Sequence, residues 1–321
     1  MRALAFDREL TFVADYPEPT ANAGESIVEV TLAGICGTDL EITRGYMAYR
    51  GVPGHEFVGR VVQSEDAALI GKRVVGEINA ACGACGWCRR AMGRHCAART
   101  VLGIAGRDGA FAELLRIPNL NLLEVPDTVS DEAAVFTEPI AAAYEILEQA
   151  GSLDGNCLIL GDGRLGAMVA MVLSAEGYRL ELSGHHGDKL RRIAALARNG
   201  GAIEVAIDEP PKLAQYNVVI DCTGSPSGFA RALELVEPRG TIFLKSTAAA
   251  SAAINLAPVV INEITVIGSR CGRFAPALAA IAAHKLDPRP LIDGVFALDD
   301  GIAAFTAAAD PAKFKILIRA S

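Results

Sequence analysis

Residues 157–166 read Cys-Leu-Ile-Leu-Gly161-Asp-Gly163-Arg-Leu-Gly166, and an apolar run from Ala167 to Ala175 follows. A short buried strand therefore runs into Gly-x-Gly-x-x-Gly and then into a helix, which is the context this motif requires for binding a dinucleotide. The first two glycines allow a tight turn close to a pyrophosphate, and the third lets helix and strand pack closely. The helix N-terminus then faces the anion.

Strands and helices alternate after this turn. We predict strands at 179–183, 203–207, 218–222, 241–244 and 264–268, and helices at 188–198, 229–236 and 276–284. Such alternation is typical of a doubly wound parallel α/β sheet, the Rossmann architecture. We expect an alanine-rich stretch at 248–253 to be a flexible or helical surface segment.

The first part of the chain is richer in strands. Period-two patterns and glycine breaks predict strands at 2–6, 26–32, 58–63 and 72–76, a further β region at 103–116 and a loop at 118–126. These short segments indicate a compact, barrel-like domain. The last residues, 313–319, are predicted to return to it as a terminal strand.

Two glycine-flanked motifs in this β-rich part carry candidate metal ligands. Residues 34–41 read Gly-Ile-Cys36-Gly-Thr38-Asp-Leu-Glu41, and residues 54–56 read Gly-His55-Glu56. A thiolate and an imidazole are both zinc ligands. Thr38 adds a hydroxyl that can pass a proton, and Glu56 adds a spare carboxylate, so one pocket can hold a metal and the groups its chemistry needs.

Four of the eight cysteines, Cys82, Cys85, Cys88 and Cys96, have the spacing Cys-x2-Cys-x2-Cys-x7-Cys. Four thiolates close a tetrahedral shell and leave no open position, so we expect a structural zinc. An iron–sulfur cluster and a nucleic-acid-binding zinc knuckle are the alternatives. The net charge of −8 argues against nucleic acid as a partner.

Composition bounds the class of protein. A chain of 321 residues has room for two domains. No apolar run reaches the roughly 18 residues of a membrane span, and the first residues lack the long apolar centre of a secretory signal. We therefore expect a cytoplasmic protein with no membrane partner, in which clustered cysteines bind metal and do not form disulfides.

Together these motifs resemble the zinc-containing medium-chain dehydrogenase/reductase family, with the alcohol, polyol and threonine dehydrogenases most similar. The resemblance spans nearly the whole chain and includes a fifth feature, Glu138-Pro139. It implies a GroES-like catalytic domain at 1–137 with a structural-zinc lobe at 82–96, a Rossmann NAD(P)-binding domain at 138–270, and a return to the catalytic domain at 271–321. It also suggests a homodimer or homotetramer.

The resemblance assigns roles to individual residues. Cys36 and His55 become ligands of a catalytic zinc, and Glu138 falls where the family has its third ligand. Considered without the family, Glu138 reads as a carboxylate at a helix N-terminus. Glu56 falls on a carboxylate that can approach the zinc transiently, and Thr38 on the hydroxyl that starts a proton relay. Glu41 occupies the place of a frequent relay histidine, so this step of the relay departs from the family pattern.

The implied activity is hydride transfer between a secondary alcohol or polyol and its carbonyl, with two zinc ions per chain and NAD(P) as cofactor. The alternatives are an NADPH-dependent reductase of another substrate class on the same fold, and a non-enzymatic zinc-stabilised binding protein. The four residues Cys36, Thr38, His55 and Glu138 favour the first.

Cofactor contacts are expected at the ends of several strands. They comprise Gly161, Gly163, Arg164, Leu165 and Gly166 in the turn, Ser183, Gly184 and His185 after the next strand, and Cys222, Thr223 and Arg270 further on. NAD-specific sites place an acid at the end of the second strand, where this chain has Gly184. We therefore expect NADP to be favoured, with Glu181 inside the strand as the rival acid that would bind NAD.

Overall fold

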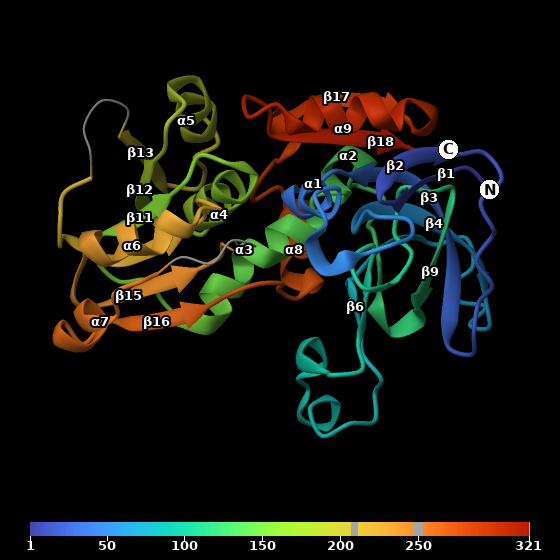
Figure 1. Cartoon of the computed structure of the whole chain (residues 1–321), viewed down its shortest axis with the longest axis horizontal. Helices are drawn as coiled ribbons and strands as arrows, with labels where there is room; N and C mark the ends of the chain where they lie inside the picture. Colours follow the sequence, from blue (N-terminus) through green and yellow to red (C-terminus); the bar gives the residue numbers. More distant parts are fainter. Residues whose placement is uncertain (207–210, 247–252, 321) are drawn as a thin grey trace. The chain divides into compact units, whose positions relative to one another are not determined.

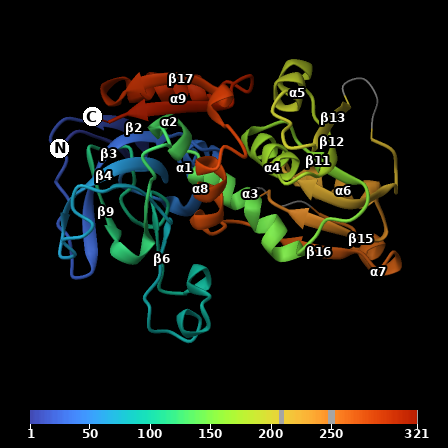
Figure 2. The same cartoon turned by 180° about the vertical axis from the view of Figure 1, so that it is seen from behind.

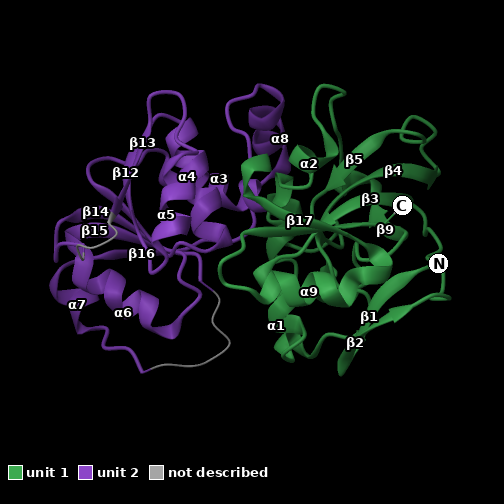
Figure 3. Ribbon diagram, turned by 90° about the horizontal axis from the view of Figure 1, so that it is seen from above, with its two compact units in different colours: residues 1–138, 289–321 green, residues 139–288 purple. Residues whose placement is uncertain are grey.

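The computed structural model describes residues 1–206, 211–246 and 253–320 (Figure 1). The alanine-rich stretch from 248 lies almost wholly outside these residues. The chain divides into two compact units, one formed by residues 1–138 and 289–321 and the other by residues 139–288 (Figure 3). Within the described residues, no helix combines the length and apolar character that crossing a membrane requires.

The first unit is built on a sheet with the strand order β10 (Leu122–Glu124), β5 (Arg73–Gly76), β4 (Glu56–Ser64), β3 (Glu25–Gly34), β18 (Lys315–Arg319) and β17 (Ile292–Ala297). Strand β9 (Leu114–Pro118) also pairs with β3. The centre of this sheet is β3 (Glu25–Gly34), a largely buried strand. On one side β3 pairs antiparallel with β4 (Glu56–Ser64), and on the other with β18 (Lys315–Arg319). Residues from the beginning and the end of the chain therefore build this unit together (Figures 1 and 2). The terminal strand predicted at 313–319 corresponds to β18.

Several elements of this unit go beyond the sequence patterns. The predicted loop at 118–126 contains β10 (Leu122–Glu124), which pairs with β5 (Arg73–Gly76). Near the end of the chain, β17 (Ile292–Ala297) and α9 (Gly301–Ala309) were not predicted. Buried Phe305 of α9 meets Phe111 edge-to-face, with ring centroids 5.5 Å apart.

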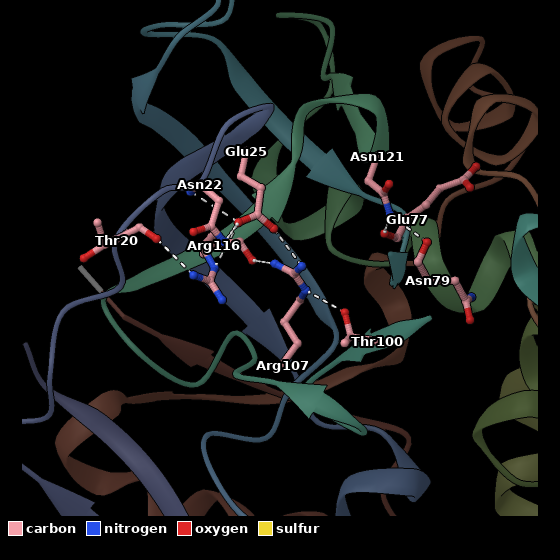
Figure 4. A network of polar contacts seen from close by, with 9 residues as sticks. All are labelled: Thr20, Asn22, Glu25, Glu77, Asn79, Thr100, Arg107, Arg116 and Asn121. Atoms are coloured by element: carbon pink, nitrogen blue, oxygen red, sulfur yellow. Dashed lines mark hydrogen bonds and ion pairs between the residues drawn. The ribbon is translucent and has the colours of Figure 1, made fainter. Parts of the chain in front are cut away.

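A carboxylate at the start of β3 ties three segments of this unit together. Glu25 is buried and accepts from Arg107 (2.7 Å) and Asn22 (2.8 Å), while Arg116 lies 3.2 Å away (Figure 4). Burial alone raises the pKa of Glu25, but the two guanidinium groups outweigh burial and hold the pKa below its usual value.

We expect Glu25→Gln to lower the free energy of unfolding by about 2 kcal/mol, because charge-assisted hydrogen bonds to a partly buried arginine are lost. The matched control is Glu29→Gln, an exposed position on the same strand, which should change stability by about 0.5 kcal/mol or less. Because the folded-state pKa is depressed, the difference should be present above pH 4.5 and shrink as the pH falls below it. Urea unfolding at two pH values measures this. Equal losses for the two variants would contradict it.

The second unit is a six-stranded parallel sheet with the order β13-β12-β11-β14-β15-β16. Its strands are β13 (Ala202–Ala206), β12 (Arg179–Ser183), β11 (Cys157–Leu160), β14 (Tyr216–Asp221), β15 (Val236–Leu244) and β16 (Thr265–Gly268). Helix α4 (Arg164–Ala175) packs on β11 and β12, α5 (Gly187–Ala194) on β13, and α6 (Pro226–Leu235) on β14 and β15. The doubly wound parallel sheet is confirmed.

Strand register aligns the carboxyl ends of this sheet. Leu160 is opposite both Ser183 and Asp221, and Leu244 is opposite both Asp221 and Gly268. The turns that follow these residues therefore emerge along one edge. In open α/β sheets this is the edge where ligands bind.

The sequence places the return to the first unit at 271, whereas the second unit extends to Pro288. Side-chain contacts explain the difference. Arg273 pairs with Glu148 at 2.9 Å, and Lys285 after α8 (Phe274–Ala282) pairs with Glu176 at 2.9 Å. Both partners belong to helical segments of the second unit, so residues 271–288 pack with it.

Candidate functional site

Cys36 and His55 are brought together in the first unit by the antiparallel pairing of β3 and β4, in which Gly34 lies opposite Glu56. Cys36 follows β3 as the N-cap of α1 (Gly37–Ile42), and His55 precedes β4. One ligand atom each from Cys36, His55 and Glu56 lies within 4.8 Å of the others. A Cβ on Gly34 would collide with the Glu56 carboxylate, so the glycine makes room for this group.

Asp39 organises this cluster and was missed by the sequence analysis. Its side chain is fully buried. Oδ2 accepts the backbone N–H of Cys36 (2.8 Å), Oδ1 accepts that of Gly54 (3.2 Å), and Nδ1 of His55 lies 3.3 Å from Oδ1. An acid three residues after Cys36, at the start of a helix, was the available signal. Because Asp39 faces Nδ1, the other ring nitrogen is left for a metal.

The electrostatics of the cluster favour a cation. Burial alone lowers the pKa of His55, but the Asp39 carboxylate and the Cys36 sulfur outweigh burial and hold the pKa well above its usual value. Oε1 of Glu56 is buried, and no group among the described residues donates a hydrogen bond to it. Soft sulfur, imidazole and an unsatisfied carboxylate oxygen around one point fit a zinc ion.

Glu56 has a buried counter-ion that the sequence analysis also missed. Nζ of Lys315, on β18, lies 2.5 Å from Oε2 of Glu56, and both side chains are at most 4% exposed. The ammonium also lies 3.4 Å from the carbonyl oxygen of Ile35 and 5.6 Å from the centre of the Phe136 ring. Lys315 therefore holds one oxygen of Glu56 and leaves the other toward the cluster.

The four cysteines of the lobe also come together. The sulfurs of Cys82, Cys85, Cys88 and Cys96 all lie within 4.8 Å of one another, and none is in a disulfide. Backbone N–H groups of Ala84 and Cys85 lower the pKa of the Cys82 thiol to about 6. Thiolate is the form that binds metal, so this set fits a closed, structural zinc site.

In the second unit, the glycine turn has the geometry that its motif predicts. Gly161 has φ +109°, and a Cβ there would lie 2.7 Å from the carbonyl oxygen of Cys222. A Cβ on Gly166 would collide with the Gly161 carbonyl, whereas one on Gly163 would meet no atom of the described residues within 4 Å. Gly163 is the N-cap residue of α4, and it forms no side-chain capping hydrogen bond to the start of this helix. Open space before a helix N-terminus fits a bound pyrophosphate.

Comparison with known protein families finds a match in each of two parts of the chain. Residues 22–127 match the alcohol dehydrogenase GroES-like domain, and residues 166–283 match the zinc-binding dehydrogenase domain. An L-threonine 3-dehydrogenase from Salmonella gallinarum is 27% identical, covering 96% of this chain and 95% of the relative. The chain belongs to the zinc-containing medium-chain dehydrogenase family.

Solved structures show the same fold over the full length. Alcohol dehydrogenase TADH from Thermus sp. ATN1 is similar with a TM-score of 0.87 and 26% identity, covering 99% of each chain. A short chain alcohol dehydrogenase from E. coli CFT073, solved with NADH, has a TM-score of 0.90 at 24% identity, again covering 99% of each chain. As a medium-chain dehydrogenase, this protein is a zinc- and NAD(P)-dependent oxidoreductase of alcohols.

The remaining predicted residues of the dehydrogenase's metal site lie as follows. Oγ1 of Thr38, a half-buried residue, is 3.9 Å from the sulfur of Cys36. Glu138 is buried in the first turn of α3 (Thr137–Ala150) and lies outside the 4.8 Å set, so its role as third ligand stays a prediction. Glu41 pairs with Arg44 at 2.7 Å in an exposed ion pair.

At the end of β12, the premise behind the NADP expectation is wrong, because a carboxylate does lie there. Oδ2 of Asp162, from the glycine turn, accepts the backbone N–H groups of His185 (3.0 Å) and His186 (2.7 Å). Glu181, the rival acid, instead accepts from the hydroxyl of Tyr216 at 2.8 Å. Tyr216 begins β14, at the end of the strand opposite the ligand edge.

The other expected cofactor contacts lie along the same edge. Cys222 follows β14, and burial raises the pKa of its thiol to about 12, so it is a neutral packing group. Exposed Thr223 donates to Oδ1 of Asp221 at 2.8 Å. Arg270 follows β16, and its carbonyl accepts from Nζ of buried Lys245 at 3.0 Å. Lys245 also bonds Ser269 (3.2 Å) and therefore fixes this turn.

Proposed function

We propose that this dehydrogenase interconverts a secondary alcohol or polyol and the corresponding carbonyl compound, with Cys36, His55 and Glu138 holding the catalytic zinc. One observation carries the proposal: one ligand atom each from half-buried Cys36, buried His55 and buried Glu56 lies within 4.8 Å of the others. The relatives named L-threonine 3-dehydrogenase support a hydroxyl-bearing substrate.

When bound, zinc supplies a Lewis acid for the substrate oxygen and the nicotinamide supplies or accepts hydride. The protein's own residues do the rest. Asp39 orients the sulfur and the imidazole through its bonds to Cys36 N–H and its contact with His55. Lys315 restrains Glu56, whose free oxygen stays near the metal position.

Thr38 is proposed to move the proton between the substrate oxygen and solvent, because its hydroxyl lies beside the ligand sulfur in a half-buried position. We expect Thr38→Val to lower kcat about 100-fold or more, the usual worth of a positioned proton-transfer group. Thr38→Ser, which keeps the hydroxyl, should retain most activity. Steady-state kinetics with zinc analysis checks this; a Thr38→Val variant as active as Thr38→Ser would contradict it.

The family supports a homodimer or homotetramer and a cytoplasmic location as further parts of the proposal. The second unit is proposed to bind NAD(P) along its ligand edge, at the glycine turn and after Ser183, Thr223 and Ser269. Arg164, Leu165 and Arg270 are proposed to contact the cofactor from the same edge.

Turnover tests the proposed function. The zinc-loaded protein is incubated with NAD⁺ or NADP⁺ and a panel of secondary alcohols and polyols, and with the reduced cofactors and matching carbonyl compounds. Formation or loss of reduced nicotinamide is followed by absorbance. We expect turnover with at least one pair and none for Cys36→Ser. No turnover in either direction, despite bound zinc and cofactor, would contradict the proposal.

A further inference from the structure

We propose that Asp162, a residue of the glycine turn, selects the cofactor. Its carboxylate accepts hydrogen bonds from the ribose hydroxyls of NAD and repels the 2′-phosphate of NADP. This inference rests on the proposed function and identifies which nicotinamide nucleotide it uses. It also reverses the expectation of NADP that the sequence suggested.

The Asp162 carboxylate lies beside the turn that follows β12. Asp162 lies between Gly161 and Gly163, and its side chain is 10% exposed. It reaches across to the turn that follows β12, where Oδ2 accepts N–H groups of His185 and His186 and lies 3.0 Å from Nδ1 of His186. The strand-end acid of NAD-binding sheets is thereby replaced by an acid from the neighbouring turn.

Gly184 makes room for this carboxylate. A Cβ built on Gly184 would lie 2.5 Å from Cβ and 2.7 Å from Oδ2 of Asp162. The backbone of Gly184 is not in the left-handed region, so conformation does not demand a glycine there. Close packing against Asp162 does. A glycine at position 184 is therefore explained by the Asp162 carboxylate, which the glycine turn places against it.

The Asp162 carboxylate can still accept hydrogen bonds from a ligand through its second oxygen. All three contacts use Oδ2, and within the part of the chain that the structure describes Oδ1 accepts no hydrogen bond. The neighbouring Gly163 faces open space at the N-terminus of α4. A pyrophosphate there places the adenosine ribose toward the end of the second strand, where the carboxylate lies.

Charge around the turn points the same way. Residues 183–187 read Ser-Gly-His-His-Gly and include no lysine or arginine. Arg191, in the helix that follows, lies 2.5 Å from Asp188 in an ion pair. A 2′-phosphate in this turn would meet a carboxylate without a dedicated guanidinium, and like charges at short range are strongly unfavourable.

Fluorescence titration of the zinc-loaded protein with NADH and with NADPH tests this. We expect the unmodified protein to bind NADH about tenfold or more tightly than NADPH. Asp162→Asn keeps a carbonyl for the two backbone N–H groups and removes the charge. It should weaken NADH and tighten NADPH, so that their Kd ratio shifts by about tenfold or more.

Two controls isolate the position of the charge. Glu181→Gln removes the rival acid, and Glu204→Gln removes an acid that is 70% exposed on β13; each should leave the ratio within about twofold. Circular dichroism checks that Asp162→Asn is folded. Preference of the unmodified protein for NADPH, or a ratio that only Glu181→Gln shifts, overturns this inference alone. Binding of neither nucleotide overturns the proposed function with it.

Discussion

Cys36→Ser is expected to abolish turnover and to lower the zinc content from about two ions per chain to about one. A serine hydroxyl is not a thiolate, and His55 with carboxylates alone holds zinc more weakly. The four-cysteine lobe does not depend on this residue, so its ion should remain. The two effects should therefore occur together in a folded protein.

Zinc analysis of purified variants measures this, with activity assayed on the same samples. Cys157→Ser is the control, because Cys157 is buried in β11 and belongs to neither ligand set, and it should keep both ions. Cys96→Ser should lose the other ion, from the lobe. Two zinc ions per chain in Cys36→Ser would overturn the assignment of Cys36 as a ligand.

Lys315→Met is expected to lower the free energy of unfolding by about 3–5 kcal/mol. Glu56 is 1% exposed, and removing the ammonium leaves its charge buried without a partner. The methionine has similar length, so lost packing contributes little. The double variant Glu56→Gln/Lys315→Met removes both charges and should recover most of the loss.

Urea unfolding of metal-depleted protein measures these stabilities without a zinc ion to compensate Glu56. Lys72→Met is the matched control, because Lys72 pairs with Glu124 at 2.8 Å on the surface. Solvent screens this pair, so its loss should lower the stability much less than the loss of Lys315 does. A Lys315→Met variant as stable as Lys72→Met, or a double variant no better than the single one, would show that the buried pair does not hold Glu56.

Local patterns in the sequence were enough to predict much of this protein. The strand, glycine turn and helix at 157–175 are contiguous, so their spacing predicted a nucleotide-binding turn, and the alternation of strands and helices after it predicted the parallel sheet. The four cysteines of the lobe fall within fifteen positions. Cys36 and His55 are only nineteen positions apart and are recognisable by residue type. Family membership follows from the same motifs and is confirmed.

The missed features depend on contacts between distant segments. Lys315 is 259 positions from Glu56, and only the insertion of β18 beside β3 brings them together. Asp162 meets a turn 24 positions away, so counting to the strand end found Gly184 without its acid. Strand β17 has no clear apolar alternation and is partly exposed, and helix α9 is apolar or small at almost every position, so it has no polar face to reveal a helical period.

Anomalous diffraction at the zinc edge, from crystals of the purified protein, tests the two-zinc dehydrogenase most directly. We expect two peaks per chain. One should lie among the sulfurs of Cys82, Cys85, Cys88 and Cys96, and the other about 2.0–2.3 Å from Cys36, His55 and Glu138 ligand atoms. A peak in the lobe alone, with none beside Cys36 and His55, would contradict a catalytic zinc in this protein.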